Sequence, residues 1–279
     1  MMKLHPVVFL LLAGLSCLAV HPAAAAETKL RVLILSGSNN HSWKETTPAI
    51  KAALEETGRF MVDVEEKVAT LKAESFAPYA VILSDFNTFG GDPAAQIWDG
   101  ATRKSFMEHL AKGHGLVIVH AGSSVFYDWP EFQNLACGSW KEGTSHGPIH
   151  VDQVTFTGEK SPITAGLQPF WIRDEFWQNT GVVPGAKALA TVSPPIAAED
   201  ATKDPAKDPA KHHNILYTHE SGGARGFAIF LGHDAAAMKN TAWRTLLQRG
   251  TEWAATGKVT LPAAKDWPAT QADAERMSP

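Results

Sequence analysis

Three short and almost uninterrupted apolar runs constrain the fold of this 279-residue chain more than any other feature. They span residues 30–36, 79–84 and 116–120, and each has the length of one strand. A strand without polar alternation is buried on both faces, as in a parallel sheet that is covered by helices on each side. Helical patterns at 46–58 and 98–112 separate the runs. The pattern predicts an α/β fold, with a doubly wound, mostly parallel sheet between two helical layers.

The second half of the chain is less regular but continues the same pattern. Extended segments are expected at 149–156, 186–192, 215–219 and 226–231, followed by a closing helix at 243–255. Gly222 and Gly223 lie between two of these strands and predict a hairpin turn. The tandem repeat at 203–210, Lys-Asp-Pro-Ala twice, cannot pack into a core and is interpreted as a solvated loop insertion.

Residues 1–26 have the pattern of a secretory signal peptide. Lys3 precedes an apolar run at 7–20, and three alanines at 24–26 provide a small-residue cleavage site. We therefore expect a periplasmic or secreted protein, with no membrane contact after cleavage. The remainder divides into one domain at 27–258 and a C-terminal tail at 259–279. Cys17 leaves with the signal peptide, so Cys137 has no intramolecular disulfide partner.

The composition excludes several classes of protein. A formal net charge of −4 provides no basic excess for neutralising phosphates, so no nucleic-acid partner is expected. With 12 histidines against 2 cysteines, Cys-rich zinc and disulfide scaffolds are excluded. The loop after Gly37 lacks both the G-x-G-x-x-G pattern and the Lys-Ser/Thr of a P-loop, so no nucleotide cofactor is expected.

Polar side chains gather where the predicted parallel strands end. The segments 37–43, 85–87 and 120–124 follow three strands and carry Trp43, Asn87 and Ser123, which we expect to contact a ligand. Ligands of open α/β sheets bind beyond the carboxyl ends of the strands. The alternative interpretation is that Ser, Asn and Gly occur there because turns need them, which does not account for the histidines in the same loops.

Histidines and carboxylates in these loops could form a metal site. His146 and His150 are separated by Gly-Pro, which prevents a helix, so only one of them is expected to face the crevice. The alternative is that these side chains only hydrogen-bond loops together. Indole rings near the same loops suit stacking on a sugar. The candidate ligands are His41, His120, His146, Glu175 and His233, and the loop tryptophans are Trp43, Trp129, Trp140 and Trp177.

A set of short motifs resembles the ThuA-like (trehalose utilisation) family from about Leu30 to Ala255. Their order and spacing match over nearly the whole mature chain. The motifs are Gly-Leu-Val-Ile-Val-His at 115–120, Trp-Pro-Glu-Phe at 129–132, Gly-Ser-Trp at 138–140, His146, Ser-Pro-Ile-Thr-Ala-Gly-Leu at 161–167, Asp-Glu-Phe at 174–176, Leu-Gly-His-Asp at 231–234 and Arg-Gly-Thr-Glu-Trp at 249–253.

The resemblance implies a flavodoxin-like variant of the class I glutamine amidotransferase fold. His120 stands where that fold carries its nucleophilic Cys, which implies that the chain is not a glutaminase. The family is associated with disaccharide catabolism, often beside oxidoreductases that make 3-keto sugars. We therefore expect an exported carbohydrate-processing enzyme that acts on keto-glycosides or disaccharide-derived sugars.

The expected chemistry is acid/base catalysis, with assistance from a divalent metal ion as an open alternative. His120 or Glu175 is the expected base, because a ketone acidifies the neighbouring C–H. Two rival functions stay open: a non-catalytic sugar-binding protein, and a metal-dependent hydrolase of another small molecule. The sequence predicts no oligomeric state. The remaining site predictions are Trp43, Asn87, Ser123, Trp140 and Asp174 for substrate and His41, His146 and His233 for metal.

Overall fold

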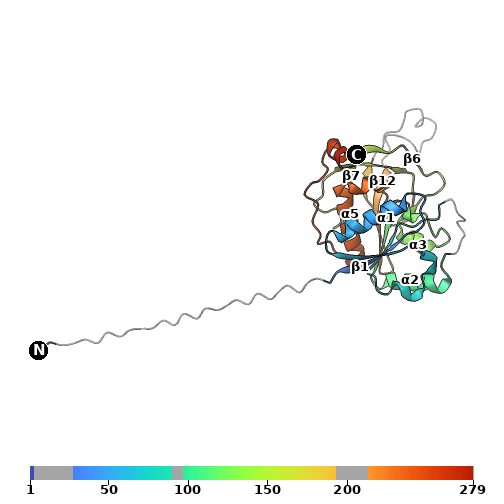
Figure 1. The fold of residues 1–279 in the computed structure, drawn as a ribbon, viewed down its shortest axis with the longest axis horizontal. Helices are drawn as coiled ribbons and strands as arrows, with labels where there is room; N and C mark the ends of the chain where they lie inside the picture. The colour runs from blue at the N-terminus through green and yellow to red at the C-terminus, as the bar shows by residue number, and fades with distance from the viewer. Residues whose placement is uncertain (3–27, 90–96, 193–212, 279) are drawn as a thin grey trace.

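The computed structural model describes residues 1–2, 28–89, 97–192 and 213–278, and its centre is a nine-stranded sheet (Figure 1). The strand order is β2-β1-β3-β4-β13-β12-β11-β7-β8. The first five strands are parallel, in the flavodoxin-like order, and the last four are joined by antiparallel pairs. This mixed sheet confirms the α/β class and adds an antiparallel half.

The strands of the large sheet are β1 (Leu30–Leu35), β2 (Phe60–Glu65), β3 (Val81–Ser84), β4 (Gly115–Val119), β7 (His150–Phe156), β8 (Phe170–Asp174), β11 (Lys187–Val192), β12 (His213–Ser221) and β13 (Ala224–Ile229). Two small antiparallel sheets pair β5 (Gly138–Ser139) with β10 (Gly181–Val182) and β6 (Ser145–His146) with β9 (Trp177–Gln178). The α-helices are α1 (Trp43–Glu55), α2 (Gly100–Ala111), α3 (Pro130–Leu135), α5 (Thr241–Thr256) and α6 (Gln271–Met277). Short 3₁₀ turns are η1 (Val68–Thr70), η2 (Ala73–Phe76), η3 (His120–Ser123) and η5 (Ala237–Lys239).

Two apolar cores, one on each face of the sheet, produce three layers. Side chains alternate between faces along a strand, so Val32 belongs to one core and the adjacent Leu33 to the other. Helices α1 and α5 pack on the first face, where Trp243 is fully buried. Helices α2 and α3 cover the second face, where Phe106 is fully buried (Figure 1). The near-continuous apolar runs are therefore explained by burial on both sides.

Several elements differ from the sequence-based expectation. Helix α1 begins at Trp43, ahead of the Thr-Pro start that the sequence indicated, so Pro48 lies inside the helix and not at its first position. Strand β8 and the four two-residue strands were not predicted, since segments this short carry no clear period. Strands β12 and β13 pair from Leu216–Ile229 to Ser221–Ala224, which confirms the hairpin turn at Gly222 and Gly223.

The segment after residue 258, expected as a tail, packs against the domain. Its helix α6 contacts β7 and β8, and Trp267 lies against Phe170 with ring centroids 5.7 Å apart. The predicted signal peptide at 1–26 and the loop insertion at 203–210 fall outside the described residues, apart from Met1 and Met2. None of the described helices is long and apolar enough to cross a bilayer.

Candidate functional site

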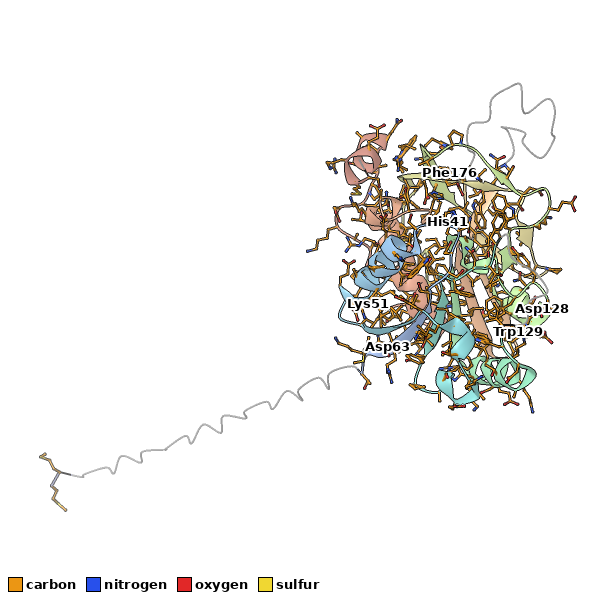
Figure 2. The ribbon with its side chains drawn as sticks, turned by 45° about the vertical axis from the view of Figure 1, so that its right-hand side comes forward. His41, Lys51, Asp63, Asp128, Trp129 and Phe176 are labelled. Carbon is orange, nitrogen blue, oxygen red and sulfur yellow. The ribbon has the colours of Figure 1, made fainter. Side chains whose placement is uncertain are left out.

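The candidate site lies at the carboxyl edge of the parallel strands. Strands β1, β3, β4 and β13 run in the same direction, so the loops that follow them meet at one edge of the sheet. The loop after β1 carries His41, the turn after β4 begins with His120, and the loop after β13 carries His233. Figure 2 shows His41 in the upper part of the molecule, together with Phe176, which lies between β8 and β9.

His120 occupies a strained turn directly after β4. Its φ of 44° lies in the left-handed region, which costs a non-glycine residue about 1–2 kcal/mol. The chain passes so close to β3 here that a Cβ on Gly122 would lie 2.0 Å from the Ser84 carbonyl oxygen. Only glycine fits at that position. The turn holds the His120 imidazole beneath the site, with 3% of the residue exposed.

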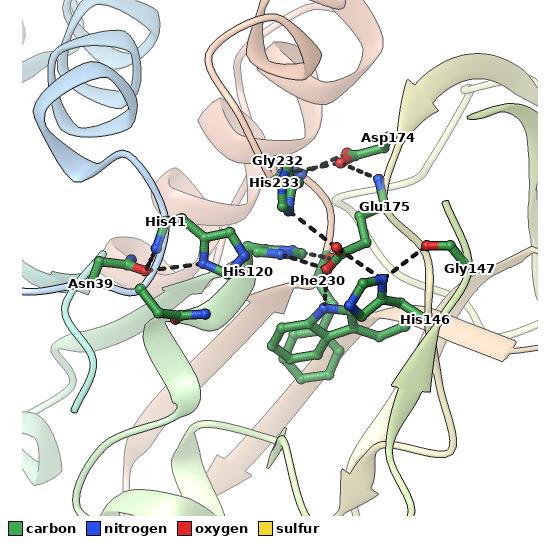
Figure 3. Close-up of polar contacts among 12 residues, drawn as sticks. Asn39, His41, His120, His146, Gly147, Asp174, Glu175, Phe230, Gly232 and His233 are labelled. Atoms are coloured by element: carbon green, nitrogen blue, oxygen red, sulfur yellow. Dashed lines mark hydrogen bonds and ion pairs between the residues drawn. The ribbon is translucent and has the colours of Figure 1, made fainter. Parts of the chain in front are cut away.

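Three imidazoles and one carboxylate converge at this edge (Figure 3). One ligand atom from each of His41, His120, Glu175 and His233 lies within 4.8 Å of the others. The His41 ring is edge-on to both partners, 4.8 Å from His120 and 4.6 Å from His233 between ring centroids. Sequence reasoning named all four residues as candidate ligands, and the fold brings them together from four separate segments.

Glu175 is the centre of the contacts in the cluster. Its Oε1 accepts a hydrogen bond of 2.9 Å from Trp177 Nε1 and lies 3.4 Å from His120 Nε2. Its Oε2 lies 3.0 Å from His146 Nδ1 and 3.4 Å from His233 Nδ1. Burial by itself raises the pKa of Glu175, but the contacts with His120 and His233 outweigh burial and hold it below the usual range. The side chain is therefore a carboxylate at neutral pH.

Two of the imidazoles have Nδ1 fixed as a hydrogen-bond donor. His120 Nδ1 donates to the Phe230 carbonyl oxygen at 2.9 Å, so Nε2 is the ring nitrogen that faces Glu175. His41 Nδ1 donates to Asn39 Oδ1 at 3.1 Å, because that oxygen also accepts the backbone N–H of His41 at 2.9 Å. Burial, together with the neighbouring His120 and His233, lowers the pKa of His41 to about 3. His41 is therefore a neutral imidazole, the form that binds metals.

Asp174 holds two segments of the cluster together. Its carboxylate accepts backbone N–H bonds from Glu175 at 2.8 Å, Gly232 at 2.6 Å and His233 at 3.0 Å. It is 1% exposed, and burial raises its pKa. The sequence assigned Asp174 to substrate, but the structure gives it backbone partners that position the residues on either side of the site.

The donor set fits a divalent cation. Among the described residues, the buried atoms His120 Nε2 and His233 Nδ1 face only the Glu175 carboxylate, 3.4 Å away, so a cation could take the place of a proton between each imidazole and that carboxylate. Four ligands at about 2.1 Å in a tetrahedron lie about 3.4 Å apart, and both histidines lie 3.4 Å from a Glu175 oxygen. Three imidazoles and a carboxylate suit zinc, iron or nickel. His146, predicted as a ligand, lies outside this group of four and contacts it through Glu175.

A small pocket opens beside the cluster. It encloses about 110 Å³ and is lined by Asn40, Phe89, Ser124, Trp140, His146 and Glu175, among others. Trp140 is half-buried, and its ring packs edge-on against Phe89 and Trp177 at 6.0 and 5.1 Å between centroids. The pocket encloses one small group, not a whole disaccharide. A larger hollow of about 680 Å³ beside α5 lies away from the cluster, and its Gln248 and Glu56 pair with each other.

The structure separates the other sequence-predicted substrate residues from this pocket. Trp43 is the first residue of α1, where the Lys44 ammonium lies over its ring. Asn87 is 1% exposed and bonded to the loop that carries His41. Ser123 is fully buried, while the neighbouring Ser124 lines the pocket. Of the predicted substrate residues, the pocket lining includes Trp140.

Four pocket-lining residues were not among the predicted site residues: Asn40, Phe89, Ala121 and Ser124. Asn40 and Ser124 lie inside the strand-end loops that were singled out, but the sequence does not indicate which residue of a loop faces the pocket. Phe89 is 48% exposed, and an apolar residue in a loop gives no signal of its own.

Cys137 is fully buried, which raises the pKa of its thiol well above the usual range, so it is no nucleophile.

Comparisons with known proteins agree with this architecture. The ThuA family model, described as trehalose utilisation, matches residues 31–254. A ThuA-like protein from Parabacteroides merdae ATCC 43184 is 28% identical, with a TM-score of 0.71 over 87% of this chain and 95% of that one. A ThuA-like protein from Bacteroides uniformis ATCC 8492 is 18% identical, with a TM-score of 0.58 over 84% and 95% of the two chains. No curated protein matches the sequence. The chain belongs to the ThuA (trehalose utilisation) family.

Proposed function

We propose that this chain is an exported carbohydrate-processing enzyme that acts on a keto-glycoside through acid/base chemistry at the histidine cluster. The observation that carries the proposal is the convergence of His41, His120, His233 and Glu175 on one point beside an aromatic-lined pocket. Membership of a trehalose utilisation family supports a carbohydrate as the substrate. Trp140 supports the same class, because a half-buried indole offers a flat apolar face to a sugar ring.

The cluster residues would hold a divalent metal ion, which supplies a Lewis acid that polarises a carbonyl oxygen. In this arrangement His120 is a ligand, because its Nε2 faces the cluster and 3% of the residue is exposed. The sequence had left His120 and Glu175 as alternative bases. Glu175 and His146 both line the pocket and lie 3.0 Å apart. Because Glu175 belongs to the four candidate metal ligands, His146 is the group that would exchange a proton with the carbon next to the ketone, and Glu175 would orient its imidazole.

The size of the pocket favours binding of one sugar ring at a time. A volume of about 110 Å³ encloses part of one sugar ring, while the rest of a glycoside would extend past Phe89 into solvent. Trp140 and Phe89 form the wall along which that ring would enter. Loss of the α-proton next to the ketone would give an enolate, which either isomerises or expels the glycosidic oxygen.

The test incubates the purified protein with a 3-keto-glucoside in deuterated water and follows α-carbon exchange and product release by NMR. We expect deuterium incorporation by the wild-type protein, bound metal in stoichiometric amount, and loss of both in His120→Ala. His114→Ala is the matched control, because His114 stacks on His109, away from the cluster. Saturable sugar binding without exchange or product would contradict an enzyme and favour a sugar-binding protein. Metal-dependent cleavage of other small molecules, without exchange, would favour the hydrolase.

A further inference from the structure

Three asparagine carboxamides, those of Asn39, Asn40 and Asn87, are hydrogen-bonded to one another beside His41. Asn87 Nδ2 donates to Asn39 Oδ1 at 2.7 Å and to Asn40 Oδ1 at 2.8 Å. Asn39 and Asn40 come from the loop after β1, and Asn87 comes from the loop after β3. The three amides therefore join the two loops on this side of the pocket.

Backbone donors fix which end of each carboxamide is the oxygen. The backbone N–H groups of Asn40 and Phe89 donate to Asn87 Oδ1 at 3.3 and 3.1 Å. A backbone N–H cannot accept a hydrogen bond, so the atom that it meets must be oxygen. The opposite atom of Asn87 is then Nδ2, a donor, and its partner on Asn40 must be Oδ1. It follows that the remaining terminal atom of Asn40 is its NH₂ group.

The protein uses the hydrogen-bonding capacity of two of the amides and leaves that of the third open. Asn87 makes two bonds through Oδ1 and two through Nδ2, which is its full capacity. Asn39 Nδ2 donates to the Asp85 carbonyl oxygen at 3.0 Å, and its Oδ1 accepts from His41. Asn40 Nδ2 makes no hydrogen bond with any described residue, and Asn40 is an exposed residue that lines the pocket. This NH₂ group is held in place and available to a ligand.

We propose that Asn40 recognises the ketone oxygen of the substrate by donating a hydrogen bond from Nδ2. The inference rests on the proposed function and adds a residue that selects the oxidised sugar. Glu175, on the same pocket wall, offers only acceptor atoms, whereas Asn40 Nδ2 is a donor. A ketone oxygen only accepts hydrogen bonds, so it needs a donor such as Asn40. A hydroxyl at the same carbon donates as well as accepts, so it can pair with either kind of group.

The variant that isolates this bond is Asn40→Asp. A carboxylate keeps the oxygen that accepts from Asn87 and replaces the NH₂ group by a second acceptor of the same shape. A ketone oxygen facing that acceptor loses its partner, whereas a hydroxyl can turn and donate to it. The matched control is Ser38→Ala, which removes the 3.1 Å bond from Ser38 Oγ to the Asn87 carbonyl oxygen and leaves the Asn40 amide intact.

The measurement is the Kd of the full protein for a 3-keto-glucoside and for the corresponding glucoside, by stopped-flow tryptophan fluorescence before turnover. Asn40→Asp should weaken ketone binding at least 10-fold and binding of the alcohol by no more than about 3-fold, since one lost hydrogen bond is worth roughly 1 kcal/mol and repulsion adds to it. Ser38→Ala should leave both values within about twofold. Bound metal is measured in each variant, because a change common to both sugars would come from the cluster.

The outcomes separate this inference from the proposed function. An unchanged ratio of the two Kd values in Asn40→Asp would overturn the role of Asn40 and leave the proposed function standing. If Asn40→Asp does not fold, Asn40→Leu replaces it, and this variant must likewise weaken binding of the keto-glucoside more than binding of the glucoside. Failure of the wild-type protein to bind either sugar would overturn both the proposed function and the inference.

Discussion

Replacement of Asp174 by Asn tests whether the cluster depends on the buried carboxylate behind it. The Asp174 carboxylate accepts three backbone N–H bonds of 2.8, 2.6 and 3.0 Å, two through Oδ1 and one, from Gly232, through Oδ2. Asparagine keeps the Oδ1 acceptor but places an NH₂ group against the Gly232 N–H. The loss of a charge-assisted bond, about 1.5–3 kcal/mol, and the stranding of a buried donor, about 1–3 kcal/mol, predict a cost of about 2.5–6 kcal/mol.

The assay is thermal unfolding of Asp174→Asn together with a zinc titration. For a domain of this size, about 2.5–6 kcal/mol lowers Tm by about 5–24 °C. Zinc affinity should fall about 10–100-fold, because Glu175 and His233 lose their common anchor. Asp266→Asn is the control, since this exposed carboxylate makes no ion pair with a described residue and should shift the unfolding free energy by less than about 0.5 kcal/mol. A Tm within 2 °C of wild type for Asp174→Asn, on the scale of ordinary surface substitutions, would refute the reasoning.

Three further predictions follow from single side chains. Burial raises the pKa of Asp85 to about 7 from 3.8, so the folded state binds more protons between these values. Ionisation of Asp85 therefore lowers the free energy of unfolding by about 2 kcal/mol as pH rises from about 5 to 7. Asp85→Asn should remove this pH dependence, measured from denaturant unfolding curves at several pH values. The same pH dependence in the variant would contradict the raised pKa of Asp85. Trp140→Ala should weaken sugar binding at least 10-fold by fluorescence titration or calorimetry, whereas Trp43→Ala, away from the pocket, should change it by less than about twofold; equal effects would contradict the stacking role. Cys137 is fully buried, so iodoacetamide at pH 8 should label it only after unfolding. Labelling of the native protein, detected by mass spectrometry, would contradict this prediction.

The sequence by itself determined the fold class and the end of the sheet at which the site lies. Runs such as Leu30–Leu35 are apolar at nearly every position, which requires burial on both faces and hence helices on both sides. Because parallel strands share a direction, the histidines that follow β1 and β4 had to lie at the same edge. These conclusions need only local pattern and the geometry of parallel pairing.

Only the tertiary structure decided which of the candidate side chains meet. His41, His120, Glu175 and His233 are far apart in the chain, and their distances depend on the strained turn at His120 and on Asp174, which joins two segments. Two side chains with the same chemistry have different environments: Asn87 is buried behind the loop, while Asn40 lines the pocket. Hydrogen-bond partners are set by contacts between loops that are remote in sequence. The amino-acid sequence alone therefore cannot identify these hydrogen-bond partners.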